Sequence, residues 1–204
     1  MKTTKCLLML STLLIYLFGN VYSVDYVDGT NSVQCIQEHH IFHKAPTFAA
    51  GFVKFSEGFT AVDTHLTFSI TEPVSGGIDL RNTSTLELLD DLYLSSNVTL
   101  SAGGLIAGHG NAIILHNDLI IPDGASLIFT DSTIIDGQGY DLVLGYTSQL
   151  VVDSHITLTL RNLTLKNTYN TIGHPAIKCL DSNGTLALDN VELALNDDFY
   201  FKNG

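Results

Sequence analysis

The 204-residue chain has little charge, few cysteines and no tryptophan. Asp, Glu, Lys and Arg make up 15% of it, well below the roughly 25% of ordinary globular domains. Lys and Arg number 9, whereas Asp and Glu number 21. Because an acidic surface repels phosphate backbones, we expect no nucleic-acid partner. Beyond residue 76 the sequence also lacks a convincing helical period, which argues against an α-rich fold.

The segment from Met1 to Ser23 predicts a secretory signal peptide. Two lysines precede an apolar run from Cys6 to Phe18, and Val21 and Ser23 occupy the two positions that signal peptidase reads. The run is shorter than the roughly 20 residues of a membrane span. We therefore expect cleavage after Ser23, no transmembrane segment in the mature chain, and a secreted, periplasmic or cell-surface location. An uncleaved membrane anchor is the alternative.

The mature chain would keep two cysteines, Cys35 and Cys179. A disulfide between them suits an exported protein, and two buried free thiols are the alternative. Cys35 also stands four and eight positions before His39 and His43. If Val33 to His43 forms an amphipathic helix, these three lie near one face and suit a soft metal such as zinc. Solvated surface histidines are the simpler interpretation.

Short apolar segments recur from residue 76 onward. They include "SLIF", "STIIDG" and "DLVL", are rich in Leu, Ile, Val and Thr, and are bounded by Gly, Asn, Asp or Ser. This pattern is typical of short strands joined by tight turns. It predicts an all-β domain.

Two motifs repeat at intervals of roughly 30 residues, a period that indicates a repeat architecture. "GGLIAGHGNAIIL" at 103–115 aligns with "STIIDGQGYDLVL" at 132–144, so that His109 and Gln138 are the variable letters of Gly-x-Gly turns. "TLTLRNLTL" at 157–165 aligns with "TLALDNVEL" at 185–193, each with an Asn or Asp corner between two strands. Such units must stack to bury their apolar sides. We therefore predict a parallel β-solenoid of roughly four to six coils after residue 76, with a β-sandwich as the alternative.

These motifs resemble the right-handed parallel β-helix proteins of the pectin-lyase-like superfamily, especially the repeat-bearing bacterial surface and adhesin-type members. The resemblance covers about residues 75–204 and implies a right-handed parallel β-helix over 76–204. Residues 24–75 lack the motif, and we expect them to form a short N-terminal cap over the first coil. The superfold includes lyases, hydrolases, adhesins and inert scaffolds, so the resemblance leaves activity open.

Two catalytic alternatives follow from the resemblance. In polygalacturonases, clustered aspartates precede a Gly-His-Gly, whereas here His109 precedes the pair Asp197 and Asp198. That order and distance do not suit carboxylates that must lie roughly 6.5–9.5 Å apart. A lyase would need acids that hold calcium, for which Asp136, Asp141 and Asp153 could line one face, and a base, for which Arg161 is the best candidate. The simpler interpretation of these acids is that they are turn residues.

We therefore expect a non-enzymatic exported or cell-surface β-helix protein that acts as a scaffold or adhesive module without a cofactor. A polysaccharide or a host or cell-surface molecule is the expected ligand. A degenerate polysaccharide lyase or glycoside hydrolase is the alternative. The closing "NDDFYFKNG" shows a strand-like segment and no covering helix. This ending predicts either a shortened repeat array or end-to-end self-association.

The signal peptide is testable on the exported protein. We expect mass spectrometry to find Val24 as its first residue, because Ser23 closes the best cleavage site. An intact Met1 in the exported fraction would favour the membrane anchor instead.

Overall fold

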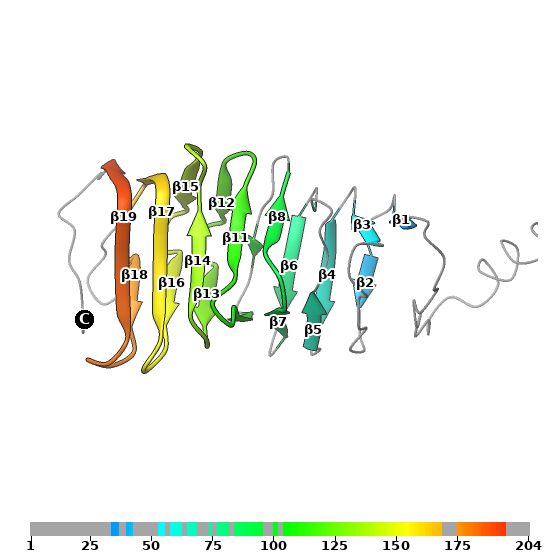
Figure 1. Cartoon of the computed structure of the whole chain (residues 1–204), viewed down its shortest axis with the longest axis horizontal. Coiled ribbons are helices and arrows are strands. Elements are labelled where there is room, and N and C mark those ends of the chain that lie inside the picture. Colours follow the sequence, from blue (N-terminus) through cyan, green and yellow to red (C-terminus); the bar gives the residue numbers. More distant parts are fainter. Residues whose placement is uncertain are drawn as a thin grey trace, which may run out of the picture.

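The computed structural model describes residues 34–36, 40–42, 53–55, 58–62, 65–68, 74, 77–81, 84–95, 100–101, 104–168 and 175–194. Within these ranges every strand pairing is parallel, and the strands stack as the coils of a β-solenoid (Figure 1). This confirms the predicted solenoid over the sandwich, which would require antiparallel pairs. None of the described residues forms a helix long and apolar enough to cross a membrane. The predicted signal peptide lies outside the described residues.

Strands recur in a fixed order on three faces of the solenoid. The first face is one sheet made of β5 (His65–Phe68), β7 (Thr85–Leu88), β10 (Leu105–Ala107), β13 (Ser126–Phe129), β16 (Gln149–Val152) and β18 (Ile177–Cys179). The second face is formed by β8 (Leu92–Leu94), β11 (Ala112–Leu115), β14 (Thr133–Asp136) and the first halves of β17 (Thr157–Lys166) and β19 (Thr185–Ala194).

The third face begins with the sheet of β2 (His40–Phe42), β4 (Gly58–Val62), β6 (Gly77–Arg81) and β9 (Leu100–Ser101). It continues with β12 (Leu119–Ile121), β15 (Asp141–Leu144) and the second halves of β17 and β19. β1 (Gln34–Ile36) and β3 (Val53–Phe55) form a separate parallel pair. Each coil therefore contributes one short strand to each face, and in the last coils two of the strands merge into one long strand.

The N-terminal segment differs from its prediction. The expected helix over Val33 to His43 is wrong in its described parts, because β1 and β2 are strands. β4 pairs with β6 and β5 with β7, so coil stacking already includes residues inside the segment that we expected to be a cap. Composition did not reveal these strands because they lack the Gly-x-Gly and Asn corner motifs of the later coils.

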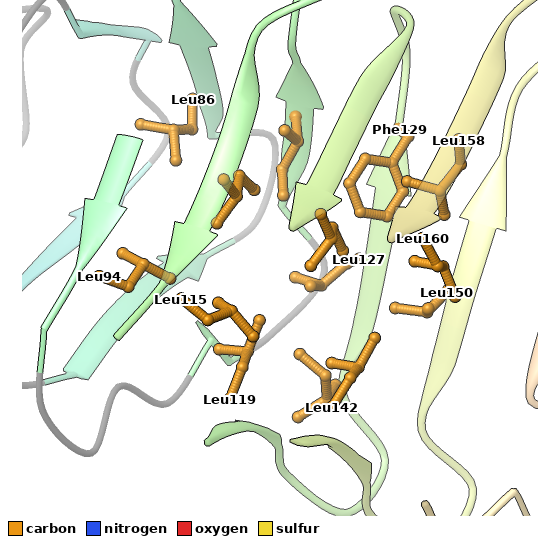
Figure 2. Packing of buried hydrophobic residues seen from close by; sticks show 14 of the residues in the cluster. Leu86, Leu94, Leu115, Leu119, Leu127, Phe129, Leu142, Leu150, Leu158 and Leu160 are labelled. Atoms are coloured by element: carbon orange, nitrogen blue, oxygen red, sulfur yellow. The ribbon is translucent and has the colours of Figure 1, made fainter. Parts of the chain in front are cut away.

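Columns of buried side chains form the core. On the first face, Leu86, Ile106, Phe129 and Val152 follow one another in register, one from each coil, and all are fully buried. Figure 2 shows such side chains pointing into the interior from neighbouring strands. Alternation along each strand sends every second residue inward. Each buried Leu, Ile, Val or Phe contributes roughly 1.5–3 kcal/mol, and it obtains this only from the neighbouring coils.

The coils differ in length, and most are shorter than the repeat interval that the sequence predicted. The interval between register partners is smaller for Ala112 and Ile134 than for Thr157 and Thr185. The alignment of 157–165 with 185–193 is a true stacking register. The alignment of 103–115 with 132–144 is not, because its two turns lie at different corners of the coil, one between β10 and β11 and the other between β14 and β15.

The two Gly-x-Gly turns nevertheless share one geometry. His109 and Gln138 have positive φ values of 51° and 53°, and the glycines that follow them, Gly110 and Gly139, have φ values of 83° and 94°. The carbonyl of Gly108 accepts from the N–H of Asn111 at 2.9 Å. Two consecutive positive φ values closed by this bond define a type I′ turn.

The predicted Asn corners are confirmed. Asn162 in β17 and Asn190 in β19 have φ values of 51° and 55°, in the left-handed region that Asn tolerates better than most residues. At each of them the long strand bends from the second face to the third.

Gly108 and Gly110 offer a test of what each glycine is needed for. A Cβ on Gly108 would lie 2.2 Å from Thr133 Oγ1 and 2.7 Å from the Ser132 carbonyl oxygen, whereas at Gly110 nothing lies within 4 Å. An Asn side chain tolerates the positive φ of Gly110, but at Gly108 its Cβ would clash with Thr133 and Ser132. We expect Gly108→Asn to lower the free energy of unfolding by about 1–3 kcal/mol and Gly110→Asn by less than about 1 kcal/mol. Urea denaturation followed by circular dichroism measures both, and equal losses would contradict the steric argument.

Candidate functional site

Four ionisable side chains form a row along the solenoid, one from each of four successive coils. They are His65, Glu87, His109 and Asp131, which follow one another at steps of 22 residues. Nε2 of His65 lies 2.8 Å from one carboxylate oxygen of Glu87, and Nε2 of His109 lies 2.9 Å from the other. Nδ1 of His109 lies 2.6 Å from Oδ2 of Asp131. We call this set the histidine row.

The strands and turns of the first face position the histidine row. His65 begins β5 and Glu87 lies in β7. His109 occupies the type I′ turn after β10, and its positive φ of 51° belongs to that turn. Asp131 lies in the turn between β13 and β14. His65 is in register with Thr85 and Glu87 with Thr67, so the contacts run diagonally between neighbouring coils, and acids and imidazoles alternate from coil to coil.

Hydrogen bonds within the row shift two pKa values in opposite directions. Bonds from His65, from His109 and from the Thr67 hydroxyl lower the pKa of Glu87 to about 2. The bond to Glu87 raises the pKa of His109, desolvation works against this rise, and the charge of Asp131 adds to it. At mildly acidic pH, His109 is thus an imidazolium that donates to carboxylates of the coils before and after its own.

The row is suited to joining coils rather than to binding a metal. Its carboxylates already accept from imidazoles, and its histidine side chains are 44–50% exposed. Among the residues that the structure describes, no group of three or more His, Cys, Asp and Glu side chains is arranged to hold a metal ion.

A second polar cluster lies where β14 meets β17. Asp136 is 3% exposed, and its register partner is Arg161. Nε and Nη2 of Arg161 donate to Oδ2 of Asp136 at 2.9 and 2.6 Å. The other oxygen, Oδ1, accepts from the backbone N–H of Gln138 at 3.2 Å and from Nδ2 of Asn162 at 3.3 Å. Both oxygens of this carboxylate therefore have partners.

The chemistry of this cluster is that of a structural ion pair. Burial works to raise the pKa of Asp136, but the hydrogen bonds from Arg161, Gln138 and Asn162 outweigh it and lower the pKa. Two hydrogen bonds direct the guanidinium of Arg161 to Asp136, as in a structural ion pair. The structure brings Asp136 and Arg161 together, as the catalytic alternative requires. Asp197 and Asp198, the rest of that set, lie outside the described residues.

Other acids bind the backbone of the next coil. A carboxylate oxygen of Asp91 accepts from the N–H of Ala112 at 2.8 Å. Asp123 accepts in the same way from Tyr146 at 2.8 Å, 23 residues further on. Each of these bonds ties a backbone amide of one coil to a side chain of the coil before it. Asp91 and Asp123 thus connect neighbouring coils, whereas Asp136, for which we expected a turn role, is the last residue of strand β14.

The cap residues form no described site. Cys35 lies on strand β1 opposite Lys54, so the helical spacing that suggested zinc does not apply to it. His39 and His43 lie outside the described residues. The calcium expected for the lyase alternative has no test here and stays a prediction.

Cys179 serves as a core residue. It is a free cysteine, it is 4% exposed, and it lies against Val152 on the first face. Burial raises the pKa of its thiol, which keeps the thiol protonated and unreactive. β1, which carries Cys35, and β18, which carries Cys179, lie toward opposite ends of the row of strands (Figure 1). This arrangement does not favour the disulfide between them, which stays a prediction.

Sequence reasoning missed the histidine row. It treated His109 as an interchangeable turn residue, because the alignment of the two Gly-x-Gly motifs placed it over Gln138. The useful signal was the constant step of 22 residues from His65 through Glu87 and His109 to Asp131. That step differs from the register interval, since His65 is in register with Thr85 and not with Glu87, so the row runs diagonally across the strands and only the tertiary structure shows it.

The two clusters and the backbone-bonding acids all connect one coil to the next. Comparisons with protein-family models, with curated proteins and with solved structures find no match. The functional conclusion therefore rests on the arrangement of the side chains.

The histidine row makes stability depend on pH. The His109 pKa is raised above its ordinary 6.5 in the fold, so its contribution is present below pH 6.5 and is lost as the pH rises through the raised value. Glu87 stabilises the fold at pH values above 4.5, its ordinary pKa. This stabilisation is lost as the pH falls toward about 2, its pKa in the fold. Between pH 4.5 and 6.5, where both contributions are present, we expect His109→Gln to lower the free energy of unfolding by up to about 1 kcal/mol. In alkaline buffer we expect a much smaller loss.

His155→Gln is the matched control, because His155 is an exposed turn residue with a φ of 61°. Thermal or urea unfolding over a pH series measures both variants. A His109→Gln effect that does not change with pH, or that His155→Gln reproduces, would contradict a role for the ion pairs.

Proposed function

We propose that the protein is an exported or cell-surface β-solenoid that acts as a non-enzymatic scaffold or adhesive module. The observation that supports this role is the use of its charged side chains. Glu87, Asp136 and Asp123 each bind a group of a neighbouring coil. A hydrolase or lyase instead needs acids and bases that converge on a substrate. The resemblance of the later coils to adhesin-type right-handed β-helix proteins supports the same conclusion.

The third face offers a surface for the adhesive role. Ile120 in β12 is 45% exposed, and Tyr140 and Tyr146, which flank β15, are 40% and 55% exposed. β12 and β15 are neighbouring strands, and Ile120 pairs in register with Val143 between the two tyrosines. Tyrosine rings combine apolar area with a polar tip and are frequent in binding surfaces. A polysaccharide or a cell-surface glycoprotein is the ligand class that we propose for this face.

The scaffold and the degenerate enzyme differ in a direct assay. The purified protein is incubated with neutral polysaccharides and with uronic-acid polymers, each with and without calcium. New reducing ends report hydrolysis, and ultraviolet absorbance of unsaturated sugars reports lyase cleavage. We expect no product above the protein-free blank. Product that disappears in a folded Asp136→Asn variant would overturn the non-enzymatic role.

Arg161 gives a stability test of the same proposal. In Arg161→Ala, the carboxylate of Asp136 stays buried and loses its two bonds from the guanidinium. We expect a loss of about 1–3 kcal/mol in the free energy of unfolding. The control is Arg81→Ala, because Arg81 pairs with Asp79 from a side chain that is 59% exposed, and such exposed pairs contribute less than about 1 kcal/mol. Equal losses in the two variants would mean that the buried carboxylate does not depend on Arg161.

A further inference from the structure

β19 presents a strand edge with no partner among the described residues. It pairs with β17 on one side, and Figure 1 shows it as the outermost strand of the row, beyond β17. An edge of this kind carries a line of backbone donors and acceptors that can pair with another strand.

The inward-facing side chains of this edge are incompletely covered. Leu160 and Leu165 of β17 are fully buried, whereas Leu188 and Leu193, their register partners in β19, are 43% and 37% exposed. The difference arises because β17 is stacked on both sides and β19, in the described structure, on one. A strand laid on β19 would continue these leucine columns and remove the exposed apolar area from water.

β19 also repeats the acid pattern of the surface on which β17 lies. Arg161 of β17 has Asp136 as its register partner on one side and Asp189 on the other. Thr164 of β17 likewise has Asp141 on one side and Glu192 on the other. Asp189 therefore continues the column of Asp136, and Glu192 continues the column of Asp141.

β17 supplies two cations that pair with Asp136 and Asp141. Arg161 binds Asp136 directly across the strands. Lys166 reaches diagonally to Asp141 from two positions beyond Thr164 and forms an ion pair with it. β19 has no lysine or arginine of its own. A strand on its open edge would therefore find two carboxylates at the positions where β17 finds them.

The corner residues repeat in the same direction. Nδ2 of Asn162 donates to Oδ1 of Asp136 at 3.3 Å, and Nδ2 of Asn190 donates to Oδ1 of Asn162 at 3.0 Å. Both asparagines have a positive φ. The row continues if the next strand also places an Asn at this corner, with its amide directed to the side-chain oxygen of Asn190.

We propose that the open edge of β19 binds a β17-like strand of a partner protein, with Arg or Lys beside Asp189 and Glu192, an Asn at the corner and leucines facing the core. This proposal rests on the scaffold role proposed above and names the kind of partner that the scaffold would hold. A second copy that docked through its own β19 would bring its Asp189 and Glu192 against the same acidic edge, and like charges across strands are destabilising.

A synthetic peptide with the β17 sequence, TLTLRNLTLK, is the probe. The control peptide replaces Arg and Lys with Glu. Fluorescence anisotropy of each labelled peptide with the purified full chain gives its affinity. We expect the basic peptide to bind at least about tenfold more tightly, since two opposite-charge contacts become like-charge contacts in the control. Hydrogen exchange should show new protection of 185–194 on binding.

The double variant Asp189→Lys and Glu192→Lys makes the test specific to the edge. Circular dichroism and the unfolding midpoint confirm that it folds, and we expect it to prefer the acidic peptide. Absence of binding, equal binding of both peptides, or a preference that survives the charge reversal overturns the proposal. Light scattering that shows a dimer of the unmixed protein also overturns it, in favour of a second copy. None of these outcomes bears on the sugar-cleavage assay, so the proposed function and this partner can fail separately.

Discussion

No coil of this protein can bury its own apolar side, and the rest of the structure depends on that constraint. A coil contributes a few short parallel strands whose inward residues meet only the residues one coil away, as Leu86, Ile106 and Phe129 do on the first face. Backbone bonding and core packing therefore have the same direction, along the stack. Stability is therefore a sum of interfaces between neighbouring coils. A coil at the end of the stack has one such interface, whereas a coil in the middle has two.

The same constraint governs the polar residues. An acid of one coil accepts from a backbone N–H of the next, as Asp91 does from Ala112 at the start of β11. Where a carboxylate is buried, as Asp136 is, the next coil supplies the cation. The small number of charged residues is consistent with this use. The charges of both clusters bind specific neighbours.

Strand alternation and corner chemistry were enough to predict the fold class and the role of Asn162 and Asn190, because both depend on residues close in sequence. The predicted coil length was wrong because a Gly-x-Gly turn occurs at two different corners of the coil. The alignment of the two motifs therefore paired segments that are not stacked on each other. The helix expected at Val33 to His43 was wrong because the apolar spacing of so short a segment is compatible with a helix or with strands. The pairing of Asp136 with Arg161 was weighed only as catalysis, although its geometry is that of an ion pair.

The sequence by itself determined that the chain is β-rich, that its strands are short and end at Gly, Asn and Asp, and that these units must stack. It did so because backbone preference and side-chain alternation are local properties. Only the tertiary structure decided which residues share a column, since register depends on the length of every intervening turn. That register brings His65, Glu87, His109 and Asp131 into one row, and it gives Asp189 the position relative to β17 that Asp136 holds on the other side. A shift of one residue in the register of β19 on β17 would turn Asp189 to the other face of the strand and abolish the second arrangement.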